Sequence, residues 1–299
     1  MQLNTNTKQL NSKEYKLILD YRKFKGTENE DRAIVTSAIE DAIKNQNLRF
    51  EKALPEIREK KVWYLDTDKH ELHNKKFTVR VKEKWGTIKQ QATFKIRDSD
   101  KELVKSYDLF TVNQQPVFEI DEQKFEEDII AKFKKDGGLG PENKFSISTE
   151  LKYNEEPNLK TCNDMLRIFP NLKLDVPQDS PLSDVNDLKV KETNYKLGEI
   201  YFKDKKKAEF GLSVWCILDK PDIDKPDIVR LPPVIAEFDI DVNAKDLLPI
   251  DENNNDVFSD PAIAEIREFY NNMSSESIVD KTNKTMTKTE FVYNYKKEN

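Results

Sequence analysis

The sequence contains few cysteines and histidines. Its 299 residues include only two of each, Cys162 and Cys216, and His70 and His73. Two cysteines cannot build the disulfide framework of a small secreted domain, and both lie among apolar neighbours, so we expect buried, reduced thiols. The two histidines have no third histidine or cysteine nearby, which argues against a zinc site.

Long apolar runs and a charge of one sign are also missing. No segment approaches the roughly 20 apolar residues of a membrane-spanning helix, and the N-terminal residues lack the apolar core of a signal peptide. The 50 basic and 56 acidic residues give a net charge of −6, which disfavours a general nucleic-acid binder but allows a local basic cavity. We therefore expect a cytoplasmic protein without a membrane or nucleic-acid partner.

Alternating and helical patterns divide the chain into short elements. Period-two alternation predicts strands at residues 13–23, 61–66, 76–84, 91–97, 144–153, 188–191, 196–203, 209–218 and 234–242. Apolar residues near the 3.6-residue period predict helices at residues 29–47, 121–135, 158–169 and 260–272. Trp85-Gly86-Thr87 predicts a hairpin turn. The tandem DKPDI pentapeptide at 219–228 predicts a stiff loop, because proline cannot donate to a sheet.

These elements favour one α+β domain that is rich in antiparallel strands. We expect it to cover residues 13–272, between a flexible arm at 1–12 and a polar tail at 273–299 with a last strand at 291–295. No linker rich in proline, glycine and serine interrupts the pattern. A division into two domains near 175–187 is the alternative.

A strand with three carboxylates on one face is the clearest chemical feature. Glu237, Asp239 and Asp241 alternate with apolar residues in the predicted strand at 234–242. Side chains alternate between the two faces of a strand, so these acids share one face at intervals of roughly 6.6 Å. Such a face can hold a hard cation such as Mg²⁺ or Mn²⁺. The alternative is an amphipathic strand whose acidic face lies in water.

Several predicted strands carry cations on one face. The pairs are Arg80 and Lys82, Lys95 and Arg97, and Lys189 and Lys191. Arginine offers a planar fork and lysine a point charge to phosphate oxygens. If the sheet closes with these charges inside, each unpaired cation costs several kcal/mol unless acids, water or an anionic ligand compensate it. If the charges face outward, no ligand is needed.

The order of these segments resembles that of the CYTH, or triphosphate tunnel, family. That family orders an aromatic-x-Asp-Thr strand, a leucine, a basic-x-basic strand and a Thr-x-Lys strand. The matching segments here are VWYLDT at 62–67, Leu72, FTVRVK at 77–82 and TFK at 93–95. VIAEFDID at 234–241 resembles the family's late acidic strand, and 260–272 the helix behind it. The likeness spans roughly residues 13–272.

The resemblance implies an eight-stranded antiparallel β-barrel, or tunnel, with flanking helices. It implies a tri- or polyphosphate ligand held by Arg80, Lys82, Lys95, Arg97, Lys189 and Lys191. It also implies Mg²⁺ or Mn²⁺ held by Glu237, Asp239 and Asp241, with Glu237 and Asp239 taking part in hydrolysis of the terminal phosphoanhydride.

The N-terminal motif of the family, Glu-x-Glu-x-Lys, is degenerate in this chain. When the motif is aligned on Lys23, Leu19 and Tyr21 stand where the acids belong. Candidate replacements for the missing metal ligands are Glu14, Asp20 and Glu150.

Three functions therefore remain open, so that the sequence does not decide whether the chain is an enzyme. The first is metal-dependent hydrolysis of an inorganic, nucleoside or other organic triphosphate inside the tunnel. The second is a barrel that binds a phosphorylated ligand without catalysis. The third is a structural or protein-interaction domain whose charged faces point to solvent. The direction in which Arg80 and Glu237 face separates the third function from the other two.

Overall fold

The three-dimensional structure is a computed structural model of the whole chain. It describes residues 9–296 except 26, 47, 88, 134–138, 203–206, 219–231, 245–260 and 283–285. The tandem pentapeptide at 219–228 and most of the predicted N-terminal arm lie outside the described residues. Within the described residues, no helix is both long and apolar enough to cross a membrane.

The described residues form strands and short helices in a regular succession. The strands are β1 (Ser12–Leu19), β2 (Arg49–Lys52), β3 (Ile57–Asp66), β4 (Phe77–Lys84), β5 (Gln90–Asp98), β6 (Phe118–Phe133), β7 (Leu139–Tyr153), β8 (Ser183–Asp184), β9 (Val190–Tyr201), β10 (Lys207–Ile217) and β11 (Pro233–Asn243). The helices are α1 (Glu28–Ile43), α2 (Glu71–Asn74), α3 (Lys101–Ser106), α4 (Cys162–Ile168), α5 (Pro261–Ser275) and α6 (Lys288–Asn294), with 3-10 turns at Tyr21–Lys23 and Val185–Asp187.

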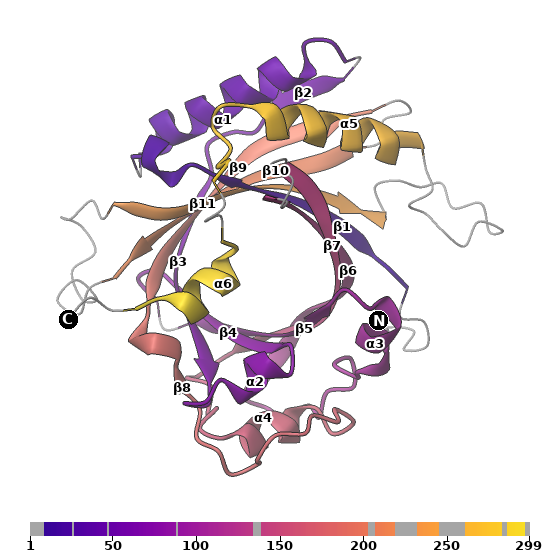
Figure 1. Ribbon diagram of the computed structural model, residues 1–299. Helices are drawn as coiled ribbons and strands as arrows, with labels where there is room; N and C mark the ends of the chain where they lie inside the picture. Colours follow the sequence, from indigo (N-terminus) through magenta and orange to yellow (C-terminus); the bar gives the residue numbers. More distant parts are fainter. Residues whose placement is uncertain are drawn as a thin grey trace.

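Nine of the described strands close into a barrel (Figure 1). Around the ring their order is β9-β10-β11-β1-β6-β7-β5-β4-β3, and β3 pairs with β9 to close it. Neighbouring strands in this described ring run antiparallel, except that β1 and β6 are parallel. The predicted α+β barrel with flanking helices is confirmed. The prediction of eight strands, all antiparallel, was wrong.

Eight strands were what the family resemblance implied, and the pattern of the chain itself was misread at β6, which was predicted as a helix at 121–135. Its charged residues Glu122, Lys124, Glu126 and Asp128 have a period of two and share one face. Glu122, Lys124 and Glu126 line the cavity, so the charged face of β6 points inward, whereas Phe125 and Ile129 on its other face pack in the outer cores. This alternation was overlooked in the prediction. The predicted strand at 291–295 was also wrong, because the helix α6 covers most of it.

The barrel carries its apolar side chains on the outside, where helices cover them. Helices α1 and α5 lie together over one side of the ring (Figure 1). There, Ile39 and Phe269 pack with residues such as Phe238 of β11 in one core. On the opposite side, Phe94 of β5 and Met165 of α4 belong to a second core. This arrangement leaves the other face of each strand to line the interior.

Two glycines relieve backbone strain in this sheet. Gly86 has a φ of 72° in the predicted hairpin turn between β4 and β5. Gly198 has a φ of 155°, and a Cβ added there would lie 2.2 Å from the carbonyl oxygen of Glu51 on β2. Position 198 therefore combines an unfavourable φ with a backbone collision, whereas position 86 has only the unfavourable φ.

We expect Gly198→Ala to lower the free energy of unfolding by roughly 2–4 kcal/mol, because the clash forces β2 away from β9. Gly86→Ala is the matched control, since nothing lies within 4 Å of its added Cβ. It should cost about 1 kcal/mol. Urea unfolding of both variants measures the difference, and equal losses would contradict the clash at Gly198.

Candidate functional site

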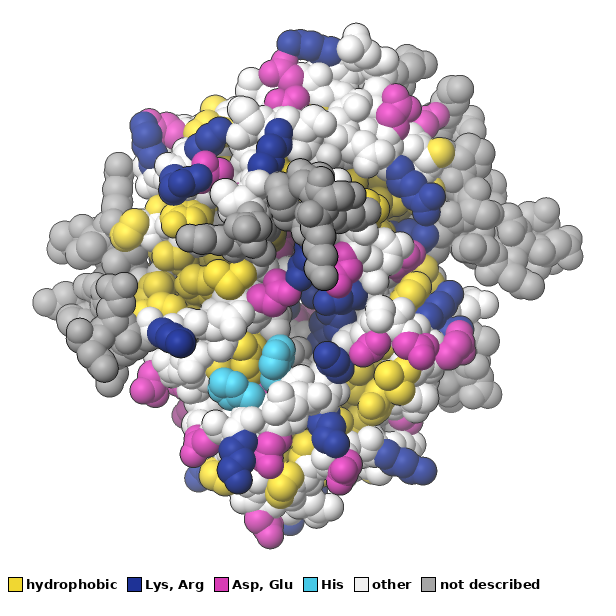
Figure 2. Space-filling view, viewed as in Figure 1, with side chains coloured by type: hydrophobic (Ala, Val, Ile, Leu, Met, Phe, Trp, Pro, Cys, Tyr) yellow, Lys and Arg dark blue, Asp and Glu magenta, His cyan; other side chains and the backbone are white. Residues whose placement is uncertain are grey.

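The inner faces of the strands enclose a cavity with a volume of about 810 Å³. Positive and negative side chains gather around the centre of the face shown in Figure 2. Six of the residues predicted from the sequence line the cavity: Arg80, Lys82, Lys95, Arg97, Glu237 and Asp239. The charged faces of β4, β5 and β11 therefore converge on one enclosed space, as a binding site for a charged ligand requires.

The structure does not bring Lys189 and Lys191 to this cavity. Lys191 Nζ lies 2.7 Å from a carboxylate oxygen of Glu59, and Lys189 Nζ lies 3.0 Å from one of Asp184. Both ammonium groups also lie over tryptophan rings, at 5.1 Å from Trp63 for Lys189 and 5.0 Å from Trp85 for Lys191. The alternation of β9 explains the placement, because it turns Glu192 into the cavity and its neighbour Lys191 to the outside.

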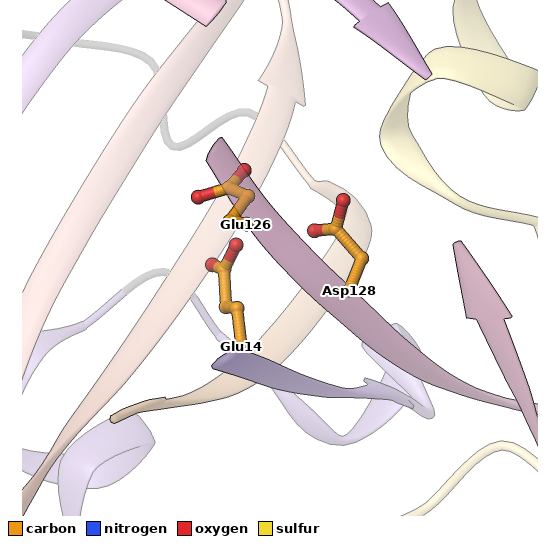
Figure 3. Close-up of side chains that lie close together, drawn as sticks. All are labelled: Glu14, Glu126 and Asp128. Atoms are coloured by element: carbon orange, nitrogen blue, oxygen red, sulfur yellow. The ribbon is translucent and has the colours of Figure 1, made fainter. Parts of the chain in front are cut away.

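A cluster of three carboxylates lies where β1 runs beside β6 (Figure 3). One oxygen each of Glu14, Glu126 and Asp128 lies within 4.8 Å of the others. The parallel register places Glu14 opposite Asp128, and Ser12 opposite Glu126. Glu14 was anticipated as a replacement ligand. Glu126 and Asp128 were missed because β6 was predicted as a helix.

The N-terminal motif lies earlier in the chain than the alignment on Lys23 placed it. Ser12, Glu14 and Lys16 share the inner face of β1, whereas Tyr21–Lys23 form a 3-10 turn after the strand. The inner face of β1 therefore carries the spacing Ser-x-Glu-x-Lys, which has one acid fewer than the Glu-x-Glu-x-Lys pattern of the family that the sequence resembles. Asp20 lies outside this face and pairs with Arg22 at 2.7 Å.

Neighbouring cations pair with the acids of this cluster. Lys16 Nζ lies 2.7 Å from Glu14 and 3.0 Å from Asp128, and Arg97 Nη2 lies 2.6 Å from Asp128. Burial opposes ionisation of Asp128, but Arg97 and Lys16 together hold its pKa well below the ordinary range. Lys95 Nζ, 2.5 Å from Glu126, completes the network.

A second group of charges lies where β4, β5 and β7 adjoin. Lys82 Nζ is 2.6 Å from Glu150, which also accepts a hydrogen bond from Thr93 Oγ1 at 2.8 Å. Burial and the nearby Arg80 lower the pKa of Lys82 to about 8. Burial works against ionisation of Glu150, yet Lys82 and Thr93 lower its pKa to about 2. Arg80 differs from the other three predicted cations, because it has no hydrogen bond or ion pair with the described residues.

Glu192 of β9 is a buried acid of the cavity that the sequence did not reveal. It accepts hydrogen bonds from Trp215 Nε1 at 2.8 Å and from Ser213 Oγ at 3.2 Å. Burial opposes its ionisation, but Lys288 and Arg80 lower its pKa strongly. In the sequence, Val190 and Glu192 share one face of this strand and Lys189 and Lys191 share the other. The prediction chose the face with the two lysines as the binding face.

Asp239 and Asp241 on β11 differ from the acids described above, because no ion pair within the described residues compensates them. Burial, Glu14 and Glu237 raise the pKa of Asp239 to about 8. Burial and Glu14 raise the pKa of Asp241 to about 7, although Asp241 does not line the cavity. A Cβ added at Gly211, opposite Asp239, would lie 2.5 Å from its carboxylate, so this glycine makes room for the acid.

The acidic residues have the chemistry of a site for a hard divalent cation. Carboxylate oxygens are the ligands that Mg²⁺ and Mn²⁺ prefer, and opposite ligands of octahedral Mg²⁺ lie roughly 4 Å apart. One oxygen each of Glu14, Glu126 and Asp128 lies within 4.8 Å of the others, so that the three carboxylates could hold one ion. Burial is the largest cause of the raised pKa values of Asp239 and Asp241, and the negative charge of Glu14 adds to it; a bound cation would favour the ionised form of both acids.

Comparisons with known proteins give matches among solved structures alone. No family model and no curated protein matches the chain. The candidate adenylyl cyclase HpAC1 from Hippeastrum, described as having a dominant triphosphatase activity, is 8% identical over 95% of both chains, with a TM-score of 0.42. A candidate adenylate cyclase from Bacillus halodurans is 15% identical over 92% of this chain and 95% of its own, with a TM-score of 0.38.

A protein from Pyrococcus horikoshii is 8% identical over 94% of this chain and 97% of its own, with a TM-score of 0.35. The first two proteins are described as candidate adenylyl cyclases, and the first also as having triphosphatase activity. At such low identities and TM-scores the likeness assigns no activity to this chain.

The buried network makes Asp128 a strong determinant of stability. Its side chain is 0% exposed and faces both Lys16 and Arg97. We expect Asp128→Asn to lower the free energy of unfolding by roughly 3–5 kcal/mol, because it removes the carboxylate paired with Arg97 and leaves Lys16 with Glu14 alone. Glu102→Gln removes an acid whose side chain is 79% exposed and should change the value by less than about 0.5 kcal/mol. Urea unfolding at pH 7 compares the two, and similar values would contradict the network.

The pKa of Asp239 predicts a pH-dependent stability. Because the folded protein raises this pKa from 3.8 to about 8, it binds the proton more tightly than the unfolded chain does. The contribution to stability is complete below pH 4 and is lost as the pH rises through 8. In metal-free buffer, Asp239→Asn should therefore be more stable than the native protein by roughly 2–5 kcal/mol at pH 9. The difference should vanish near pH 4, and a difference that does not change with pH would refute the shift.

Proposed function

We propose that this protein binds a tri- or polyphosphate anion together with a divalent metal inside its barrel and hydrolyses the terminal phosphoanhydride. The observation that carries the proposal is the inward-facing guanidinium of Arg80. Lys82, Lys95 and Arg97 each have a carboxylate partner, whereas Arg80 has none among the described residues. The nearby acids Glu192 and Glu150 favour the charge of Arg80, but no hydrogen bond or ion pair within the described residues engages its N–H donors. These donors are therefore available to an anionic ligand in the cavity.

The cations of β4 and β5 are proposed to bind the phosphates. Arg80 can form a two-pronged contact with phosphate oxygens, and Lys82 and Lys95 supply neighbouring point charges. The cavity of about 810 Å³ is large enough for a small organic group attached to the phosphates. The function of the charged faces as a solvated protein-interaction surface is not proposed, because these faces line the cavity.

The acids are proposed to hold the metal and to handle the proton. Glu14, Glu126 and Asp128 would hold Mg²⁺ or Mn²⁺, with Glu237 on the adjoining β11, and Asp239 would remain free of the metal. When bound, such a cation polarises a phosphoryl oxygen and lowers the pKa of its water. Asp239 is the proposed proton acceptor, since a pKa of about 8 makes its carboxylate unusually basic.

One observation favours binding without catalysis as a second candidate function. Ser12 occupies the inner-face position at which the Glu-x-Glu-x-Lys pattern has its first acid, and its Oγ donates to Glu126 at 3.5 Å. A hydroxyl is a weaker ligand for Mg²⁺ than a carboxylate, so metal affinity would be lower. Release of phosphate from a bound triphosphate separates the two candidates.

We expect Arg80→Met to weaken binding of tripolyphosphate by about 10- to 100-fold, because hydrogen bonds to charged groups contribute about 1.5–3 kcal/mol. Lys189→Met removes a cation from the outer face and should leave the affinity unchanged. Calorimetric titration in the presence of Mg²⁺ measures both variants. Equal losses in the two variants, or no binding by the native protein, would contradict an interior phosphate site.

The proton-acceptor role makes a separate prediction. Asp239→Asn should bind tripolyphosphate within about threefold of the native affinity but release phosphate at least 100-fold more slowly, since general-base catalysis contributes about 10²–10⁴-fold. Malachite-green detection of phosphate at pH 8 measures the rate. If the native protein binds the ligand yet releases no phosphate, the binding function replaces the hydrolytic one. Native-like rates in Asp239→Asn would exclude this residue as the base.

A further inference from the structure

The C-terminal segment places a lysine inside the cavity. Lys288, the first residue of α6, lies with its Nζ 3.0 Å from Glu237 and 3.4 Å from Glu192. The side chains of Lys288, Glu237 and Glu192 are 14%, 8% and 7% exposed. The ammonium therefore neutralises two buried carboxylates, one on β9 and one on β11.

The start of α6 is fixed by a capping box, which directs Lys288 toward the cavity. Thr287 accepts a hydrogen bond from the backbone N–H of Glu290, and the Glu290 carboxylate accepts one from the backbone N–H of Thr287. Glu290 also forms an ion pair with Lys132 of β6. In Figure 1, α6 lies across part of the barrel's opening, and residues 287–290 line the cavity.

The rest of α6 is attached to the rim of the barrel by a small set of contacts. Tyr293 Oη donates to Asp66 Oδ2 at 2.9 Å, and its ring stacks on His73 with centroids 3.8 Å apart. Asn186 Nδ2 donates to the carbonyl oxygen of Val292 at 2.8 Å. Short helices are marginal on their own, so this docking depends on tertiary contacts that a competing interaction can offset.

We infer that Lys288 is a counter-cation to Glu237 and Glu192 and that it competes with a divalent metal for Glu237. Metal binding therefore loosens the docked α6. The inference rests on the proposed function, because it takes Glu237 as part of the metal site. It goes beyond that function by assigning a regulatory role to residues 287–294.

Charge and reach support the competition. A divalent cation at Glu237 would repel an ammonium that lies 3.0 Å from the same carboxylate. The Lys288 side chain is enclosed and also lies over the Trp215 ring, with 5.6 Å between Nζ and the ring centroid. The ammonium therefore has little room to withdraw while the first turn of α6 stays in place. By linkage, a metal that weakens docking is itself bound more weakly while α6 is docked.

Binding of Mn²⁺ alone tests the inference, with free Mn²⁺ followed by electron paramagnetic resonance at pH 7.5. We expect Lys288→Gln to bind Mn²⁺ at least tenfold more tightly than the native protein. Lys288→Arg keeps the positive charge and should bind within about threefold of the native affinity. A Lys288→Gln affinity equal to or weaker than the native one would overturn the competition.

A second variant acts without touching the cavity. Tyr293→Phe removes the hydroxyl that donates to Asp66 and keeps the ring that stacks on His73. It should loosen α6 and raise the Mn²⁺ affinity by about threefold or more. In the native protein, Mn²⁺ should also speed tryptic cleavage after Lys288. A cleavage rate that is unchanged while Mn²⁺ is bound would overturn the link between metal and docking.

The outcomes separate this inference from the proposed function. If the native protein binds Mn²⁺ and tripolyphosphate but Lys288→Gln shows no gain, the competition fails and the proposed function stands. If neither protein binds Mn²⁺, the inference fails together with the metal-dependent function. If Mn²⁺ binding shows the expected gain but tripolyphosphate does not bind, the counter-cation role holds and the proposed substrate is wrong.

Discussion

The pairing of buried opposite charges is the interaction on which the barrel's interior depends. Asp128 is enclosed with Lys16 and Arg97, and neither sign could be buried without the other. The pairing is incomplete, because Arg80 has no contact of this kind and Asp239 carries a raised pKa. Within the described residues, Arg80 therefore keeps donors for an anion, and Asp239 and Asp241 keep carboxylates without an ion pair for a cation.

The apolar outer face of the barrel supplies the hydrophobic burial that offsets the free-energy cost of this charged interior. Residues such as Val79 and Phe94 are completely buried under helices, so the hydrophobic core lies around the ring. From the sequence we had treated an apolar core face and an inward charged face as alternatives. They are the two faces of the same strands, because helices outside the barrel give the apolar side chains a place to pack.

How far the sequence could predict the site depended on whether the signal was local. The faces of β4, β5 and β11 followed from simple alternation, so Arg80, Lys95 and Glu237 were identified correctly as sharing one interior. Contacts that depend on strand pairing could not be derived. The parallel register of β1 and β6, which joins Glu14 to Asp128, has no local signature. Lys288 was hidden for the same reason, since it lies 51 positions from Glu237 in the polar tail.

A crystal structure with tripolyphosphate and Mn²⁺ would test the central arrangement most directly. Anomalous scattering locates Mn²⁺ without assumptions about the protein. We expect a Mn²⁺ peak beside Glu14, Glu126 and Asp128 and phosphate density against the guanidinium of Arg80. Phosphate bound at Lys189 and Lys191 on the outer face, with no Mn²⁺ in the cavity, would contradict the assignment of the interior as the functional site.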